Sequence, residues 1–469
     1  MNQAHYSLFA RGWRLLREAL KGTSQDFTQG SLSRGIALLA IPTVVEMAME
    51  STFGLVDGIW VSRLGAAAIA AVGLTEALLI LIFSFALGLS TAATAAVARR
   101  VGEKNLEGAA VAAVQAIACG AIAGIVLGIG GAHYAPRLLE LMHAEPGVVR
   151  AGSGYAAVLL GGNASIMLLF LINGVFRGAG DAAVAMRVLW LANLVNLALD
   201  PCLIYGWAHF PKLGVTGAAV ATTTGRSFGV LYQLWVLVYG NSRVRVAVRH
   251  LKPDWPVLGR LLRVGGIAML QYFISTASWL TLVRINALFG SIAVAGYTIA
   301  VRIIWFTILP SWGIVSAAAT LVGQNLGAKR PDRSERAVWM AGVYNMMFLT
   351  AVAAVFFAAA PWMATWFGSD ERVQAVAVTA LRTISLGYPF YAWGMTMEQA
   401  FNGAGDTATP TWINLCCYWL FQIPLAWWLS QRTNLGARGV YLAICVAESL
   451  LAVVAMVLFR RGRWKTARV

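Results

Sequence analysis

Apolar residues form long blocks along the chain, and the blocks repeat from one end to the other. Twelve blocks reach about 20 residues, which is the length that an α-helix needs to cross the hydrocarbon core of a bilayer. A soluble core cannot use so many, so the pattern predicts an all-α, polytopic membrane protein with twelve transmembrane helices. The blocks cover residues 34–60, 67–96, 108–132, 150–172, 185–207, 213–239, 264–288, 293–322, 336–360, 374–400, 410–430 and 438–459.

The composition agrees with this interpretation. The 469 residues are 59% hydrophobic and 12% charged, whereas an ordinary soluble chain is about 45–50% apolar and about 25% charged. The formal net charge of +16 raises the question of a nucleic-acid partner. If the N-terminus is cytoplasmic, 25 Lys and Arg residues fall on the cytoplasmic side and 7 on the other. This bias follows the positive-inside rule, so it predicts cytoplasmic termini and needs no nucleic acid.

The N-terminal 30 residues are polar and basic, and no cleavable signal is evident in them. The stretch 8–22 is either an amphipathic helix at the membrane surface or a frayed tail. The five cysteines lie in apolar segments without CxxC spacing, and the five histidines are scattered. We therefore expect no disulfide framework, no zinc site and no cofactor. The polar side of the amphipathic helix would carry Arg11, Arg14, Arg17 and Lys21.

The chain repeats itself at a nearly constant offset. FRGAGDAA (176–183) matches FNGAGDTA (401–408) at an offset of 225 residues, which also pairs Gly88 with Gly313 and Gly102 with Gly327. LGVTGAAVAT (213–222) matches LGARGVYLAI (435–444) at an offset of 222. The repeat predicts two six-helix halves of the same orientation, an arrangement with which transporters build a midplane cavity. GAGD follows no strand, so we interpret it as a tight helix connection and not as a dinucleotide fingerprint.

These patterns divide the chain into five parts. A cytoplasmic N-terminal tail (1–33) precedes an N-lobe (34–240) with the first six helices. A basic cytoplasmic linker (241–263) joins it to a C-lobe (264–459), and a basic tail (460–469) follows.

Three carboxylates stand in the first apolar segment, within VVEMAMESTFGLVDGIW (44–60). Each costs about 2.5–3.5 kcal/mol near a bilayer centre. Glu46, Glu50 and Asp57 are spaced i, i+4 and i+11, so they share one helix face. Pro42 precedes Asp57 by 15 residues and supplies a place where this helix can bend, so we assign it as a hinge.

The fifth segment carries a second polar stripe. Asn193, Asn196 and Asp200 are spaced i, i+3 and i+7, so they also share a face. A lone membrane asparagine is more often a bridge between helices, but a stripe with an acid, opposite an acidic first helix, indicates function. Burial and like charge disfavour ionisation of two facing carboxylates, so the pair can bind protons or hold Na⁺ with Asn196 and hydroxyls as further ligands.

The second half lacks this stripe, because Tyr418, Phe421 and Leu425 occupy the equivalent positions. We therefore assign the chemistry to the N-terminal half. Met47 and several other Met and Trp residues either line an adaptable cavity or contact lipid. For the remaining membrane charges we expect structural pairing or snorkelling to the interface. These are Glu76, Arg226, Arg284, Arg302, Arg382, Glu398 and Glu448, of which Arg226 and Glu448 are repeat equivalents.

Together these motifs resemble the multidrug and toxic compound extrusion (MATE) family over residues 34–460, most closely its DinF-like prokaryotic branch. The resemblance rests on Pro42 and Asp57 with VDGIWVSRLG, and on NGVFRGAGD, NLALDP and the GxxGAAxAT opening of the sixth helix. It implies a secondary transporter of the inner (plasma) membrane, and not an enzyme. Such a transporter exports bulky cationic or amphiphilic compounds in exchange for H⁺ or Na⁺ by alternating access.

The resemblance also implies roles for particular residues. The coupling acids of that branch correspond to Asp57 and Asp200, its fifth-helix amide corresponds to Asn196, and a sixth-helix hydroxyl corresponds to Thr222. Na⁺ would bind at Asp57, Asn196 and Asp200. Asn173 and Asn193 match positions near the substrate cavity. The expected partners are small-molecule substrates and membrane lipid, with the protein acting as a monomer.

Two features depart from the family pattern. The seventh segment, MLQYFISTASWL, has no carboxylate, although the NorM-like branch carries one there, and this argues against a site in the C-lobe. Glu46 and Glu50 exceed the single first-helix acid of the DinF-like branch. They either favour cationic substrates in the cavity or alter proton stoichiometry, or one of them pairs with an arginine.

The alternative function is a flippase for lipid-linked oligosaccharide or lipid, which would need a basic cavity in place of this acidic one. A membrane hydrolase would need a nucleophile with its base, and none is evident.

Overall fold

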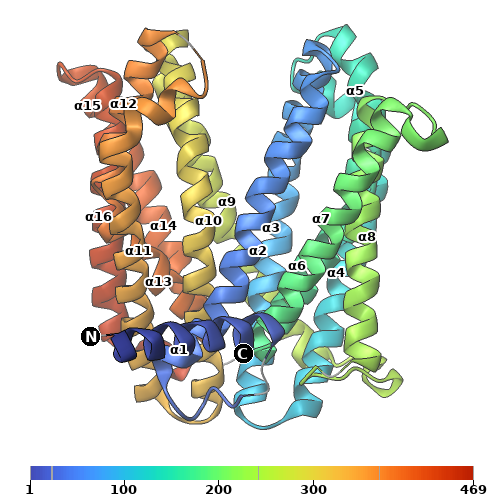
Figure 1. Ribbon diagram of the computed structural model, residues 1–469, viewed down its shortest axis with the longest axis vertical. Coiled ribbons are helices and arrows are strands. Elements are labelled where there is room, and N and C mark those ends of the chain that lie inside the picture. The colour runs from blue at the N-terminus through green and yellow to red at the C-terminus, as the bar shows by residue number, and fades with distance from the viewer. Residues whose placement is uncertain (1, 23–24, 241, 369, 468–469) are drawn as a thin grey trace.

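A computed structural model describes residues 2–22, 25–240, 242–368 and 370–467, with the backbone alone for residues 2–11 and Leu55. In these residues the chain is helical (Figure 1). The α-helices are α1 (Asn2–Lys21), α2 (Leu32–Ser62), α3 (Ala66–Gly102), α4 (Leu106–Leu141), α5 (Pro146–Gly161), α6 (Asn163–Ala179), α7 (Ala182–Tyr205), α8 (Val215–Tyr239), α9 (Trp255–Ala287), α10 (Ser291–Gly327), α11 (Pro331–Thr365), α12 (Glu371–Ser385), α13 (Tyr388–Ala404), α14 (Ala408–Asn414), α15 (Ile423–Arg432) and α16 (Ala437–Arg460). Short 3₁₀ turns η1 (Trp207–His209), η2 (Val248–Leu251) and η4 (Arg463–Thr466) and a π-helical segment η3 (Leu415–Gln422) complete the list.

The all-α polytopic fold is confirmed, and each of the twelve predicted segments coincides with one helix or one broken helix. Three segments are broken. Segment 150–172 bends by 42° between α5 and α6, segment 374–400 is interrupted between α12 and α13, and segment 410–430 passes through η3. Within the described residues, eight helices are individually long and apolar enough to cross a membrane, or nine with the bent pair α5–α6 as one span.

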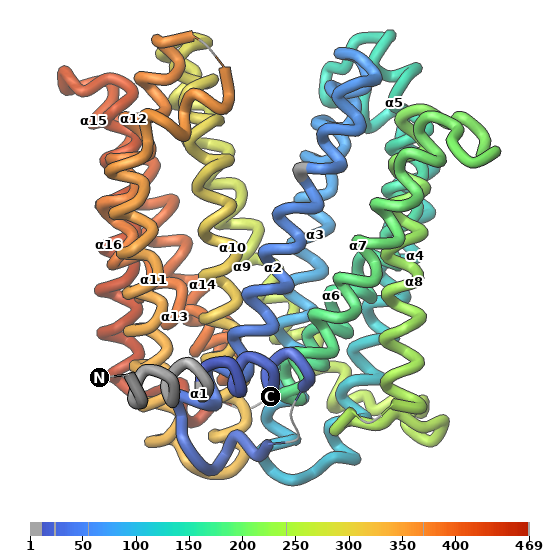
Figure 2. The backbone as a smooth tube through the Cα atoms, viewed as in Figure 1, coloured from blue at the N-terminus to red at the C-terminus, as the bar shows by residue number. Residues whose placement is uncertain are grey.

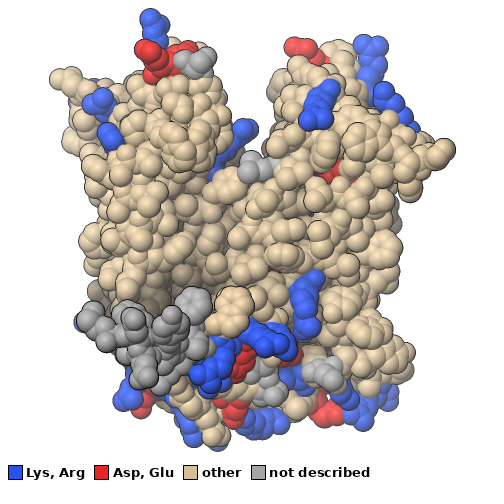
Figure 3. Space-filling view, viewed as in Figure 1, with Lys and Arg blue, Asp and Glu red and all other residues tan. Residues whose placement is uncertain are grey.

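The two sequence halves form two groups of helices (Figure 1). Helices α2–α8 form one group and α9–α16 the other. The groups diverge at one end and converge at the other, and α1 lies near the convergent end (Figure 2). Lys and Arg gather at this convergent end, and the space-filling view is hollowed between the two groups at the opposite end (Figure 3). We refer to this basic, convergent end as the closed end.

Repeated glycines let the two halves approach at the backbone. A Cβ on Gly88 of α3 would lie 2.6 Å from the Met269 nitrogen of α9, and one on its equivalent Gly313 of α10 would lie 2.6 Å from the Val44 nitrogen of α2. At the closed end, a Cβ on Gly102 would lie 1.9 Å from the Gln324 oxygen. The equivalent Gly327 would place its Cβ 2.1 Å from the Arg99 oxygen. Equivalent glycines of the sequence repeat therefore make equivalent contacts between the two halves.

The GAGD motifs form the tight connections predicted for them. Gly180 and Gly405 end α6 and α13 with φ of 90° and 86°, a left-handed conformation that glycine adopts without strain. In both places the following aspartate nitrogen bonds back to a phenylalanine carbonyl, at 2.8 Å for Asp181 and 3.0 Å for Asp406. The Asp181 carboxylate also accepts from the Ser242 hydroxyl (2.8 Å), so the first motif fastens the segment that leads to the second half.

The segment between α1 and α2, residues 25–30, lies across the closed end, and we refer to it as the N-terminal strap. Arg330 donates to the Thr28 carbonyl (2.9 Å) and Arg333 to those of residues 29 and 30 (2.9 Å each), from the α10–α11 corner. Asp26 bonds to Lys104 of the α3–α4 corner (2.6 Å). The Phe27 side chain is 1% exposed. The strap therefore holds the corners of both halves together.

Truncating the central side chain of the strap should weaken the closed end. Removing a fully buried phenylalanine costs about 3–5 kcal/mol in protein cores, so Phe27→Ala is expected to lower the melting temperature of the purified protein. The measurement is thermal unfolding in detergent. Trp13→Ala is the control, because Trp13 on α1 is 62% exposed. Equal melting temperatures for the two variants would contradict a clamping role for the strap.

The ion pair of the strap does not respond to moderate acid. Burial opposes ionisation of Asp26, but its hydrogen bonds from Lys104 and Thr28 outweigh this, and its pKa falls to about 2. A depressed carboxylate pKa contributes stability that is present above the unfolded value, 3.8, and is lost as the pH falls through about 2. The strap contact is thus retained at every pH at which a proton gradient is normally imposed.

The helix that opens the second half begins earlier than predicted. α9 starts at Trp255, inside the stretch 241–263 that the apolar pattern assigns to the linker. The reason is local, because the Asp254 carboxylate caps the helix by accepting from the Val257 nitrogen (3.0 Å) and Pro256 occupies its first turn.

In the N-terminal part of the chain, Glu18 of α1 pairs with Arg34 (2.7 Å). Arg14, Arg17 and Lys21 are at least partly exposed, and the side chain of Arg11 lies outside the described residues.

Candidate functional site

The polar stripe of the fifth segment lies on the buried side of α7. Asn193, Asn196 and Asp200 are 6%, 2% and 0% exposed. With the Asn196 amide oriented to satisfy both of its atoms, its nitrogen donates to both Asp200 oxygens (2.9 Å each) and its oxygen accepts from the Thr222 hydroxyl of α8 (2.9 Å). The i, i+4 spacing on one helix brings the amide over the carboxylate. Three of the four residues predicted for cation coupling therefore form one hydrogen-bonded group.

The fourth predicted coupling residue, Asp57 of α2, is partly buried, and its Oδ1 atom has no hydrogen-bond partner in the described structure. It interacts electrostatically with Asp200, so two carboxylates share this part of the N-terminal half. Tyr155 of α5 interacts electrostatically with both of them. The site therefore draws on α2, α5, α7 and α8.

The three acids of α2 have different partners. Glu46 is 1% exposed and accepts from Asn173 (3.1 Å) and from Arg177 (3.3 Å), both on α6. Asn173 in turn accepts from Gln233 of α8 (2.7 Å). Glu46 is thus the acid that pairs with an arginine, which is one of the alternatives left open by the sequence. Asn173 lies in this buried network.

Glu50 lies one turn further along α2 and is partly buried. It accepts a hydrogen bond from Asn193 (3.2 Å), so α2 and α7 are joined by a carboxylate–amide contact beside the Asp200 group. Met47 is at least partly exposed on the same helix. Pro42 lies within α2, which continues as one α-helix from Leu32 to Ser62, so the structure shows no break at the predicted hinge.

Arg226 of α8 belongs to this site, although the sequence indicated only structural pairing or snorkelling for it. Its NH1 atom is buried without a hydrogen-bond partner, and among the described residues it makes no ion pair within 4.0 Å. It interacts electrostatically with Glu50 and Asp57. The available signal was an arginine in the middle of an apolar helix, which is costly unless compensated.

The architecture is that of a multi-pass membrane transporter, with two parallel halves that meet along α2, α3, α9 and α10 and a buried carboxylate group in one half. The sequence profile of the MatE family matches residues 42–202 and 267–428. The chain belongs to this family of transporters, and it is not an enzyme.

Individual relatives cover most of the chain. It is similar to the probable multidrug resistance protein NorM of Thermotoga maritima (24% identity over 92% of this chain and 93% of that protein). It is also similar to the FAD transporter of Shewanella oneidensis (24%, 92% and 95%). Among solved structures it resembles an outward-facing multidrug resistance MATE transporter (TM-score 0.88, 29% identity, 94% and 98% coverage) and a MATE in the bent conformation (0.86, 29%, 95% and 97%).

Proposed function

We propose that this protein is a secondary antiporter, which exports bulky cationic or amphiphilic compounds in exchange for H⁺ or Na⁺. The observation that carries the proposal is Asp200, a carboxylate with no exposed surface in a membrane helix. An ionised carboxylate without a compensating charge is very costly in such a place. It is stable when protonated or when a cation lies beside it, so the site exchanges positive charge with its surroundings.

The neighbours of Asp200 supply what such an exchange needs. Asn196 and Thr222 offer neutral oxygen atoms, and Asp57 offers a second carboxylate with an unpartnered oxygen in the described structure. Carboxylate and carbonyl oxygens are the ligands that hard cations prefer. These four residues fit either one Na⁺ or protons on the two acids. In this proposal Glu50 and Asn193 extend the polar surface toward a cationic substrate, Glu46 and Asn173 support it, and Met47 contacts its apolar parts.

The shape of the molecule supports alternating access. By the positive-inside rule both termini lie on the cytoplasmic side of the inner (plasma) membrane, and the hollow between the halves opens outward (Figure 3). In this proposal the protein works as a monomer. Binding of the coupling ion changes the local charge, and α2 responds by bending at Pro42, where the helix lacks one hydrogen-bond donor.

The coupling ion is tested by imposing one gradient at a time. Proteoliposomes loaded with a fluorescent cationic dye are expected to release it under a proton gradient or a sodium gradient, but not without either. The wild-type protein is compared with protein-free liposomes of the same lipid. The gradient that drives release identifies the ion, and release at the protein-free rate under both gradients would contradict antiport.

A second candidate cargo is anionic, because Arg226 places a buried guanidinium nitrogen in the site without an ion pair among the described residues. Such a cargo would be a lipid-linked pyrophosphate, as in a flippase, or a flavin nucleotide, and one relative is named as an FAD transporter. Arg226 interacts electrostatically with two acids, Glu50 and Asp57, so the surroundings are acidic overall, which favours the cationic cargo. Uptake of radiolabelled FAD into the same proteoliposomes tests the alternative directly.

A further inference from the structure

The C-terminal half holds two carboxylates of its own, on helices that are far apart in the sequence. Glu398 lies on α13, and Glu448 lies on α16, where it is 5% exposed. They are near enough to repel each other electrostatically. Among the described residues, neither makes an ion pair within 4.0 Å with Lys, Arg or His. Pairing with a basic side chain, one of the roles expected for them, is therefore not found in the described residues.

One of the two acids is held by a tyrosine from the π-helical segment. The Tyr418 hydroxyl donates to the Glu448 carboxylate at 3.2 Å to one oxygen and 3.5 Å to the other. Tyr418 is the repeat equivalent of Asn193, which donates to Glu50 in the first half. The second half thus also has a side chain at this position that donates to a carboxylate.

Several buried oxygens beside the pair have no hydrogen-bond partner in the described structure. They include Glu398 Oε1 and the side-chain oxygen of Asn414, a residue that interacts with Glu398 and is 1% exposed. The Asn414 nitrogen donates to the Ser275 hydroxyl (3.0 Å). A buried acceptor without a donor is costly. Both of these oxygens accept hydrogen bonds or cations, so a proton, a cation or a donating water would satisfy them.

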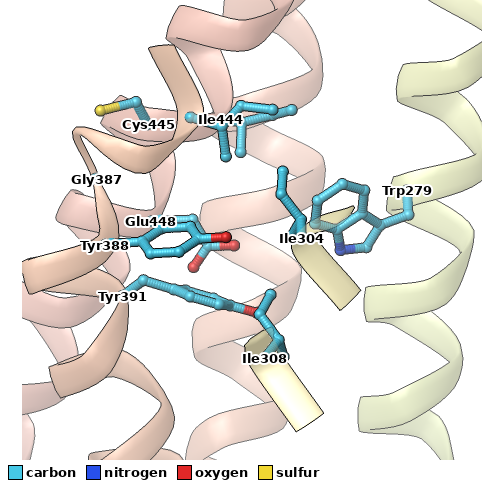
Figure 4. A pocket seen from close by; sticks show the side chains of 10 residues that line it. Trp279, Ile304, Ile308, Gly387, Tyr388, Tyr391, Ile444, Cys445 and Glu448 are labelled. Carbon is cyan, nitrogen blue, oxygen red and sulfur yellow. The ribbon is translucent and has the colours of Figure 1, made fainter. Parts of the chain in front are cut away.

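A small cavity leads to Glu448 (Figure 4). Its lining includes Trp279 of α9 and Tyr388 and Tyr391 of α13. Tyr388 is 2% exposed, and Figure 4 shows its ring and the Glu448 side chain among the residues that line the cavity. The cavity is large enough for one water-sized occupant.

The described titratable groups around the cavity carry no positive charge. Tyr391 and Tyr418 interact electrostatically with both acids, and Cys417 and Cys445 lie nearby. From α9, Tyr272 interacts electrostatically with Glu398 and with Arg177 of the first half, and Ser278 donates to Gln422 (3.0 Å). These surroundings differ from those of the first half, where Arg177 and Arg226 lie among the acids. Two ionised carboxylates here would have no ion-pair partner within 4.0 Å among the described residues.

We propose that Glu398 and Glu448, with Tyr418 and Asn414, form a second monovalent-cation site, which binds H⁺ or Na⁺ in the C-terminal half. This revises the assignment of all chemistry to the N-terminal half. The site does not depend on a seventh-helix carboxylate, because its acids come from α13 and α16. The claim that this site binds a cation does not depend on the proposed antiport function; only its role in coupling does.

Cation binding is measured on the purified full-length protein in detergent, in two arms. Potentiometric titration above about pH 6, where ordinary exposed carboxyl groups have already released their protons, counts the protons that remain bound, and equilibrium binding of ²²Na⁺ at fixed pH counts sodium. Glu448→Gln is expected to bind one proton fewer than the wild type in the first arm, or one Na⁺ fewer in the second. The arm that changes identifies the ion. Glu371→Gln is the matched control, because it makes the same chemical change at an exposed acid in the first turn of α12.

Two further variants keep the test decisive. Glu398→Gln is expected to give the same loss as Glu448→Gln, and it is available if the latter does not fold, as judged by gel filtration. Asp200→Asn removes the acid of the first half, so its loss should add to that of Glu448→Gln in the double variant. Unchanged proton and Na⁺ counts in both glutamine variants would overturn the second site. A failure of dye transport in the wild type would instead overturn the antiport proposal and leave these counts valid.

Discussion

Replacing Asp200 with asparagine is expected to reduce dye efflux from proteoliposomes to the rate of protein-free liposomes. Asparagine has nearly the same shape as aspartate, but its amide group does not take up a proton near neutral pH and carries no negative charge to balance a cation. The wild-type carboxylate is fully buried and bonded to Asn196. The substitution should therefore abolish the exchange of charge at this site and leave the packing of the side chain nearly unchanged. Asp57→Asn should have the same effect, since the two carboxylates interact. The measurement is dye release under the driving ion gradient.

The matched control is Asp332→Asn, the same chemical change at an acid in the first turn of α11, far from the polar stripe of α7. It should transport at the wild-type rate. Gel filtration and equal insertion into liposomes establish that the variants are folded. Wild-type efflux by Asp57→Asn and Asp200→Asn would remove these residues from the coupling mechanism, whatever the cargo proves to be.

Adding one methyl group at Gly102 is expected to open the closed end of the protein. A Cβ there would lie 1.9 Å from the Gln324 oxygen of α10, so the two helices must separate. Overpacking of this kind costs about 1–3 kcal/mol, which corresponds to a shift of roughly 5- to 150-fold between two conformations. The readout is labelling of Thr320→Cys by a membrane-impermeant maleimide, in a background without the native cysteines. Thr320 is 1% exposed, and it donates to the Arg177 carbonyl of the other half (3.0 Å).

Gly259→Ala provides the comparison, because Gly259 lies on α9 and a Cβ there meets nothing within 4 Å. Alanine is the better helix former by about 1 kcal/mol, so this variant should be at least as stable as the wild type and leave the introduced thiol unlabelled. Gly327→Ala should behave like Gly102→Ala, since it makes the equivalent contact. Labelling at the Gly259→Ala level in both would mean that the glycine contact does not hold the end closed.

Much of the fold follows from the sequence, because the lipid imposes a simple rule on it. Apolar blocks of about 20 residues must become helices, since the backbone has no other way to bond within a bilayer. The repeat then sets the orientation of the halves. The breaks were less accessible: the bend at Gly162 and the π-helical segment around Tyr418 lie inside continuous apolar runs, and hydropathy does not distinguish a straight helix from a broken one. The start of α9 was missed because its cap precedes the apolar run.

The candidate site was predictable to the extent that it follows helical periodicity. The stripe of Asn193, Asn196 and Asp200 comes from spacing on one helix, and the structure brings it together with Thr222 as the resemblance implies. Which partner each acid of α2 receives was not predictable, because Glu46 meets Arg177 through the packing of α2 on α6. The proximity of Glu398 and Glu448 was not predicted for the same reason. Each is the single acid of its apolar segment, and only the tertiary fold makes the two neighbours.

Arg226 and Glu448 occupy the same place in the two copies of the repeat, yet one is a base and the other an acid. Two identical six-helix chains that assembled as a dimer would carry the same residue on both sides. A positive charge in one half and a negative charge in the other is therefore available to a fused chain, whose two copies accumulate substitutions independently, but not to a dimer of identical chains. The shared geometry of the interface glycines, equivalent at Gly102 and Gly327, would let such divergence proceed without loss of the common scaffold.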